Sequence, residues 1–260
     1  MSWIEDPGAL LVATGEGLGN RFVIARAAVL RDAGATPAAM ARAVCGEQWD
    51  GLLLIEEHGL AEIINRDGSP GGTCLNGLRV LARLDGGESG LFRMDGREVS
   101  WRRVDAGIEL SLRGSDIPED ARKPAVFELL GKRAHAVSFW NPHAVVHVDD
   151  PQQEELAAYA RAATARLDLF PEGVNLELVG PIDAQGSVAM RVMERGVGET
   201  EACGSGAVAV ALQAWAQGYE GALQVQMPGG SLLLQPLADG GLSLTGDASV
   251  RLLVQDSASA

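Results

Sequence analysis

The chain has 260 residues and a formal net charge of −14, with an isoelectric point near 4.7. That length suits one large domain or two small ones. An acidic surface does not attract phosphate backbones or anionic headgroups, so the charge argues against a nucleic-acid or membrane partner. No apolar run is long enough to span a bilayer, and the opening MSWIEDPGAL lacks the form of a secretory leader. We therefore expect a cytoplasmic protein.

The three cysteines do not have the spacing of a metal site. No CxxC motif occurs, and the four histidines do not lie beside the cysteines in the sequence. An odd count of cysteines fits a reducing compartment. Cys45 follows the apolar stretch AAMARAV and reads as an ordinary small core residue. We therefore expect no metal site at these cysteines.

Strand-like apolar runs dominate the first half. They lie at 10–13, 22–25, 52–56, 61–64 and 107–112. Thr36 followed by Pro37 predicts a helix N-cap and first turn, and Gly46 is expected to end that helix. A second helix is predicted from about 75 to 84, stopped by the glycines at 86 and 87.

The polar stretch 114–123 has no clear period and is our expected crossing between two lobes. After it the pattern repeats, with strands at 136–139 and 144–148, a helix from 151 to about 166, and strands at 174–179 and 188–194. The helix after Cys203 is apolar nearly all round and should be buried, with Gly218 as its C-cap.

Both halves thus show strands followed by a helix that begins at a cysteine, Cys74 in TCLNGLRV and Cys203 in ACGSGAVA. The separation, 203 − 74 = 129 residues, is about half the chain. We therefore predict an α+β fold of two lobes, 1–115 with Cys74 and 116–260 with Cys203, and leave open whether the last strand returns to the first lobe. A thiol at a helix N-terminus lies among free backbone N–H groups at the positive end of the dipole, which stabilises a thiolate.

Two glycine-rich segments have competing interpretations. GEGLGN at 15–20 follows a strand but has Asn20 where a dinucleotide fingerprint has its third glycine, so a hairpin turn is favoured. ERGVGETEACGSGAVA at 194–209 is equally compatible, taken alone, with a buried structural cysteine and with a ligand loop. The neighbouring Glu194 and Arg195 favour the ligand loop, because such a pair suits the ammonium and carboxylate of an amino acid.

Five segments, GLGNRF, NRDGSPGGTCLNGLR, NPHAVV, PEGVNLE and ERGVGETEACGSGA, stand in the order of the motifs of the diaminopimelate epimerase family, and they span nearly the whole chain. The sequence resembles that family. The resemblance implies two similar lobes, each a barrel-like, mostly antiparallel sheet wrapped around a central helix, with the active site in the cleft between them. It also implies catalysis without pyridoxal phosphate or metal.

The resemblance implies a role for each matching residue. Cys74 and Cys203 would be two bases that remove and return the α-proton from opposite faces of LL- or meso-diaminopimelate. Glu194 and His143 match positions that bind substrate or tune the cysteines. The substrate contacts implied are the backbone at Leu75, Asn76, Gly77, Gly204 and Ser205, and the side chains of Asn20, Asn65, Asn141, Asn175, Glu194 and Arg195.

Taken singly, some of these residues have simpler interpretations. Asn65 precedes Asp67-Gly68 and suits a turn, and His143 suits a structural hydrogen bond behind Pro142. The chain also departs from the family pattern at Arg21, Gly51 and Leu75, where the family usually has Asp, Gln and Gly, and at Arg251, where an aromatic residue of the dimer contact is often found.

Two alternatives to diaminopimelate epimerisation therefore stay open. One is a related cofactor-independent racemase of another amino acid; an isomerase of the phenazine-biosynthesis type is disfavoured because that type is expected to lack the cysteine pair. The other is a non-catalytic relative that only binds an amino acid. The expected partner is a small amino-acid substrate, and a homodimer is left open.

Overall fold

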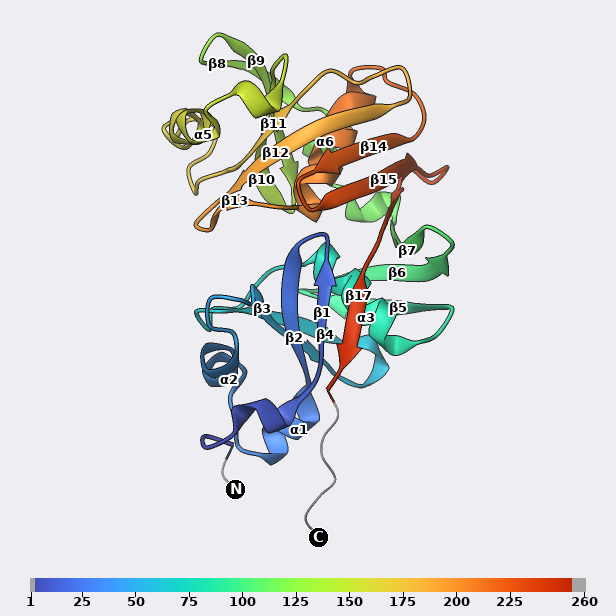
Figure 1. Cartoon of the computed structure of the whole chain (residues 1–260). Helices are drawn as coiled ribbons and strands as arrows, with labels where there is room; N and C mark the ends of the chain where they lie inside the picture. The colour runs from blue at the N-terminus through green and yellow to red at the C-terminus, as the bar shows by residue number, and fades with distance from the viewer. Residues whose placement is uncertain (1–2, 254–260) are drawn as a thin grey trace. The chain divides into compact units, whose positions relative to one another are not determined.

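The computed structural model describes residues 3–253, and its fold is α+β, as predicted (Figure 1). The described chain divides into two compact units. The N-terminal unit contains residues 3–110 and 246–253, and the C-terminal unit contains residues 111–245. The sequence placed a boundary after 115, whereas the units change after 110 and again after 245. Among residues 3–253, no helix is long and apolar enough to cross a membrane.

The N-terminal unit contains a five-stranded sheet in the order β17-β1-β2-β3-β4. All neighbours in it are antiparallel except β2 and β3, which are parallel and are connected through two short helices. Strands β5 and β6 form an antiparallel pair, and β7 follows. The strands are β1 (Leu11–Gly17), β2 (Asn20–Arg26), β3 (Gly51–Ile55), β4 (Ala61–Asn65), β5 (Ser89–Met94), β6 (Arg97–Val104), β7 (Gly107–Leu112) and β17 (Ser249–Leu252). Short 3-10 turns are η1 (Pro7–Leu10) and η2 (Glu57–Gly59).

Helix α3 (Leu75–Asp85) lies against both sets of strands in this unit. It contacts β1, β2, β3 and β17 of the five-stranded sheet, and also β5 and β6. Strand β1 approaches the helix so closely that a Cβ at Gly15 would come within 2.3 Å of Val80 Cγ1. The glycines of GEGLGN therefore serve packing and a turn: Leu18 and Gly19 have φ of 53° and 86° and join β1 to β2. The predicted hairpin is confirmed.

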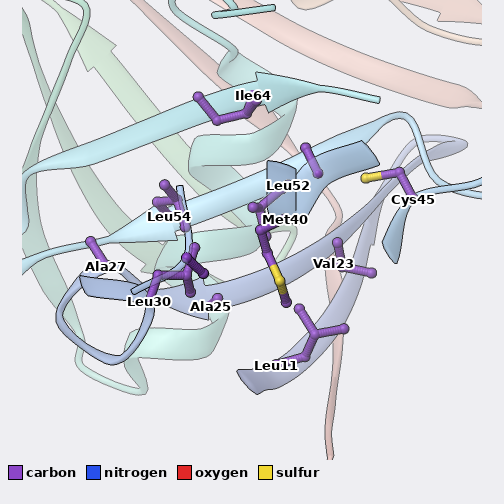
Figure 2. Packing of buried hydrophobic residues seen from close by; sticks show 12 residues of the cluster. Leu11, Val23, Ala25, Ala27, Leu30, Met40, Cys45, Leu52, Leu54 and Ile64 are labelled. Atoms are coloured by element: carbon purple, nitrogen blue, oxygen red, sulfur yellow. The ribbon is translucent and has the colours of Figure 1, made fainter. Parts of the chain in front are cut away.

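A hydrophobic core fills the other face of β2 and β3 beneath α1 (Ala27–Asp32) and α2 (Pro37–Val44) (Figure 2). Thr36 caps α2 as predicted, its side chain accepting a hydrogen bond from Ala39 N at 3.3 Å. Cys45 is fully buried in this cluster. Burial, with a smaller effect of Asp50, raises the pKa of its thiol to about 11, so the structural interpretation of Cys45 is confirmed.

The C-terminal unit contains eight hydrogen-bonded strands in the order β16-β15-β14-β12-β11-β10-β9-β8, with β13 beside β12. Neighbours are antiparallel except for the parallel pairs β10–β11 and β12–β14. The strands are β8 (Ala125–Leu129), β9 (Lys132–Phe139), β10 (Asn141–His147), β11 (Asn175–Val179), β12 (Ser187–Glu194), β13 (Gly198–Thr200), β14 (Leu223–Met227), β15 (Gly230–Pro236) and β16 (Leu242–Gly246).

Helix α6 (Gly204–Ala216) packs against β9, β10, β11, β14 and β15 and against the short helix α4 (Glu119–Arg122). Its apolar sequence on all sides is explained by contacts on all sides. The helix predicted from 151 begins later: Pro151–Gln153 is a separate 3-10 turn, η4, capped by Asp150, and α5 runs from Leu156 to Thr164. Another short turn, η3 (Gly114–Asp116), precedes α4 in the stretch expected to cross between the lobes.

The two units share one plan of strands and helix. In each, an antiparallel hairpin (β1–β2 or β9–β10) leads through helical segments to a parallel third strand (β3 or β11), then to an antiparallel fourth strand (β4 or β12), and then to the buried helix. The register also agrees, since Phe22 lies opposite Gly51 and His143 lies opposite Asn175. Residues of the two units can therefore be compared position by position.

Candidate active site

Both cysteines occupy the N-cap position of the buried helix of their unit. The Cys74 Sγ accepts a hydrogen bond from Gly77 N at 3.3 Å, and the Cys203 Sγ accepts one from Gly206 N at 3.4 Å. Each sulfur thus takes the place that a Ser or Asp oxygen usually fills at a helix start. The positive end of the helix dipole faces it, which favours a thiolate and any anion bound beside it.

The start of α3 brings together four of the predicted site residues around Cys74. The amide of Asn76, buried in the helix, donates to Asn20 Oδ1 at the start of β2. Gly77 is buried directly above Cys74. Cys74 is half-buried, and its backbone N–H contacts Met94 Sδ at 3.3 Å. Leu75, also buried, is the first helical residue, so this position needs no left-handed conformation.

Asn65 has a local role in the structure. It ends β4 and is exposed, and its Nδ2 donates to Ser69 Oγ at 3.0 Å in the turn that follows. Ser69 is in turn held by Asp67. The turn interpretation of Asn65 therefore describes what the side chain does here, and its contact with substrate stays a prediction.

The start of α6 is more enclosed and carries more charge. Cys203 is buried, with Ser205 Oγ 3.5 Å from its sulfur. Glu194, at the end of β12, accepts a hydrogen bond from Thr200 Oγ1 at 2.6 Å and also interacts with Cys203. Burial raises the pKa of the Glu194 carboxyl, and Thr200 acts in the opposite direction. Burial, followed by the charges of Glu194 and Glu177, raises the pKa of the Cys203 thiol well above its usual value.

A buried hydrogen-bonded pair lies beneath this helix start. His143 Nδ1 and Glu177 Oε1 are 2.6 Å apart, and both side chains have no exposed surface. Glu177 lies directly under the helix, because a Cβ at Gly206 would be 2.7 Å from its Oε1. The sequence analysis identified His143 but missed Glu177. A charged residue in the middle of the apolar strand NLELV was the signal that pointed to it.

Asn175 and Arg195 are joined through the backbone. Arg195 N donates to Asn175 Oδ1 at 2.8 Å, while the exposed guanidinium donates to Glu172 O at 2.7 Å. Glu194 and Arg195, with Gly196 to Gly198, line a cavity of about 410 Å³ within the C-terminal unit. Asn141 is half-buried at the start of β10, at the position that Asn20 holds in β2.

The shared plan makes the two helix starts directly comparable. By register, His143 corresponds to Phe22 and Asn175 to Gly51. Glu177 corresponds to Leu53, whose Cδ2 would lie 2.8 Å from a Cβ at Gly77, as Glu177 lies under Gly206. Glu194 corresponds to Asn65. A second residue that sequence reasoning missed, Arg79 of α3, is fully buried in the N-terminal unit.

The family model described as diaminopimelate epimerase matches residues 135–251. The diaminopimelate epimerase of Rhodospirillum centenum is 35% identical over 257 residues, covering 88% of this chain and 86% of the relative. That of Carboxydothermus hydrogenoformans is 31% identical over 262 residues, covering 90% and 94%. The chain belongs to the diaminopimelate epimerase family. As a member it is an isomerase.

A solved structure agrees on the fold. The predicted epimerase PA4716 of Pseudomonas aeruginosa aligns with a TM-score of 0.62 at 18% identity, covering 94% of this chain and 97% of that one. At such low identity the likeness speaks for the fold alone. Within the part of the chain that the structure describes, no three His, Cys, Asp or Glu side chains gather as a metal-binding cluster.

Proposed function

We propose that this protein interconverts LL- and meso-diaminopimelate by proton transfer at one α-carbon, with Cys74 and Cys203 as the two bases. The observation that carries the proposal is the pair of N-cap cysteines, each with its sulfur held by a glycine N–H three residues further on. This arrangement occurs in a chain whose relatives at 31–35% identity are named diaminopimelate epimerases.

In the proposed reaction one cysteine thiolate takes the Cα proton while the other, as a thiol, gives a proton to the opposite face. An amino-acid Cα–H is a far weaker acid than a thiol, so the site must stabilise the carbanion. Its negative charge spreads onto the substrate carboxylate. The backbone N–H groups at the starts of α3 and α6, at Leu75, Asn76 and Gly77 and at Gly204 and Ser205, would hold that carboxylate.

The distal amino-acid group of the substrate requires a second set of contacts. Arg195 and Glu194 offer a cation and an anion beside the 410 Å³ cavity, in line with a carboxylate and an ammonium. Asn20, Asn65, Asn141 and Asn175 are proposed to add amide contacts. Position 51 offers no side-chain amide because it is glycine, and a Cβ there would lie 2.7 Å from Ile64 O. We propose a cytoplasmic enzyme of lysine and peptidoglycan precursor biosynthesis that needs no cofactor.

The proposal is tested by incubating the reduced enzyme in deuterium oxide with LL-diaminopimelate, meso-diaminopimelate and a panel of other amino acids. We expect deuterium at Cα and interconversion of the two diaminopimelate isomers. Exchange with a different amino acid alone would replace this function by that of another racemase. Binding of diaminopimelate without exchange would identify a non-catalytic relative.

A further inference from the structure

The charges around the two N-cap cysteines differ in sign. In the C-terminal unit, the carboxylates of Glu177 and Glu194 lie at the start of α6. In the N-terminal unit, Leu53 and Asn65 occupy the equivalent positions, and no carboxylate takes their place. The buried ionic group of α3 is a cation, Arg79.

Arg79 is poorly compensated by its own unit. Its Nε donates to Asp247 O at 3.5 Å, and among the described residues neither terminal nitrogen has a hydrogen-bond partner. A buried guanidinium requires a negative partner, because removing a charge from water is costly unless it is paired. Burial lowers the pKa of Arg79 to about 10, and the charges of Cys74 and Asp247 act against that change. The residue is therefore a cation at neutral pH, and Cys74 is one of the two groups whose negative charge favours that state.

From this asymmetry we propose that Arg79 and Glu177 are positioning residues that fix the resting protonation of the cysteine pair, Cys74 as the thiolate and Cys203 as the thiol. The proposal rests on the function proposed above. In the first half-reaction, the electron pair of Cys74 takes the proton of the substrate Cα–H, and the C–H electrons form the carbanion. The carbanion then takes the S–H proton of Cys203, which leaves Cys74 as the thiol and Cys203 as the thiolate.

The second state places a thiolate among carboxylates and is the less stable of the two. It returns to the first state by turning over the product isomer or by exchanging protons with solvent. Glu177 disfavours the Cys203 thiolate by its charge, while the contact with His143 holds its carboxyl group under Gly206. The other Glu177 oxygen, Oε2, has no hydrogen-bond partner among the described residues.

The other titratable groups near Cys203 do not make the Cys203 thiolate the more stable of the two thiolates. Of the elements packed against α6, β14 and β15 carry none. On β9, His135 lies opposite Val145, and Lys132 and Arg133 lie further along the strand. These three residues are therefore displaced from His143 toward the C-terminal end of α6. His147 lies at that end as well. On α4, Glu119 and Asp120 are exposed, and Arg122 is bound to Gly114 O and Gly240 O.

The groups near Cys74 add a further cation. Arg97 donates to Thr73 Oγ1 at 3.1 Å, next to Cys74 in the chain, and is also paired with Asp95. The remaining charged residues of α3 and of the strands against it are exposed or half-exposed: Glu16, Arg21, Arg26, Arg83, Asp85, Arg93, Glu98, Arg102, Arg103 and Arg251.

The test is a titration of thiolate absorbance against pH in the absence of substrate. Cys203→Ser isolates Cys74, and Cys74→Ser isolates Cys203, with Cys45 titrating separately near pH 11. We expect Cys74 to ionise at the lower pH. Glu177→Gln in the Cys74→Ser protein should lower the Cys203 midpoint by about one pH unit. Arg79→Met in the Cys203→Ser protein should raise the Cys74 midpoint by a similar amount. Arg79→Lys, which keeps the positive charge, should leave the Cys74 midpoint close to that of the Cys203→Ser protein.

Glu109→Gln is the matched control, since Glu109 is a buried carboxylate bound to Arg102, and it should leave both midpoints unchanged. Glu177→Asp, which keeps the charge, should behave more like the parent protein than Glu177→Gln does. Cys203 ionising at or below the pH of Cys74, or midpoints insensitive to both Glu177→Gln and Arg79→Met, would overturn the proposal. Because the titration needs no substrate, it stands or falls separately from the deuterium-exchange experiment.

Discussion

The starts of α3 and α6 have the same backbone and different surroundings. Both present a cysteine at the N-cap and a glycine three residues on. Beneath Gly77 lies Leu53, while beneath Gly206 lies Glu177, bound to His143. A duplicated scaffold thus supplies two sulfur atoms in one geometry, and the neighbouring strands surround them with different residues. The comparison teaches that the N-cap alone does not define the chemistry of either cysteine.

The largest expected effect comes from the sulfur atoms themselves. Cys74→Ser and Cys203→Ser should each lower turnover by about 10²–10⁴-fold, because a hydroxyl is a much weaker base at neutral pH. Turnover is measured as interconversion of the diaminopimelate isomers. Cys45→Ala, which changes a core thiol outside the helix starts, should retain activity. Wild-type turnover in either serine variant would remove the two-base mechanism.

The same glycine substitution in the two units should have unequal effects. Gly206→Ala places a methyl group against the Glu177 carboxylate, which its hydrogen bond with His143 holds in place. Gly77→Ala places its methyl group 2.8 Å from the flexible end of the Leu53 side chain and 3.3 Å from Cys74 Sγ. We expect Gly206→Ala to lower activity about tenfold and stability by about 1–3 kcal/mol, and Gly77→Ala to cost less in both. Steady-state kinetics and urea unfolding measure the difference, and equal losses would show that the two helix starts are energetically alike.

Acid should weaken the C-terminal unit, which holds three of the four histidines. His135 is buried, and burial lowers its pKa from 6.5 to about 4, with smaller effects of His147 and Arg133. The unfolded chain therefore binds a proton more readily than the folded one between these values. Its contribution to stability is complete above pH 6.5 and is lost as the pH falls from 6.5 to 4.

His135→Phe should reduce the decrease in the free energy of unfolding between pH 6.5 and 4 by on the order of 2 kcal/mol. Urea unfolding at a series of pH values measures it. His58→Asn in the N-terminal unit, an exposed position with φ of 59°, is the control and should leave the slope unchanged. A slope that His135→Phe does not alter would assign the acid sensitivity to other groups.

The smallest effect concerns the N-caps as structural elements. A serine at position 74 or 203 keeps an acceptor for the glycine N–H, whereas alanine removes it. The alanine variants should therefore be less stable than the serine variants by about 0.5–1 kcal/mol in both units. Thermal unfolding of the four proteins checks this. A serine variant less stable than its alanine counterpart would mean that the sulfur contributes by packing rather than by capping.

Local sequence patterns determined much of the fold. Thr36-Pro37, Gly86 and the two cysteines marked helix ends that the structure confirms, because caps depend on residues within one turn. The turn at GEGLGN was recognised in the same way. The start of α5 was wrong, since Pro151 suits a first helical turn equally well in a 3-10 segment capped by Asp150.

The sequence by itself determined that two helices begin at cysteines and that the flanking motifs are those of one enzyme family. Only the tertiary structure decided what surrounds those cysteines. Glu177 contacts His143, which lies 34 residues away in the sequence, and Arg79 donates a hydrogen bond to Asp247 O, which lies 168 residues away. Such pairs depend on strand register and on which side of a helix is buried. A single sequence does not specify these, because many registers satisfy the same apolar pattern. The surroundings of each thiol are therefore a property of the folded unit.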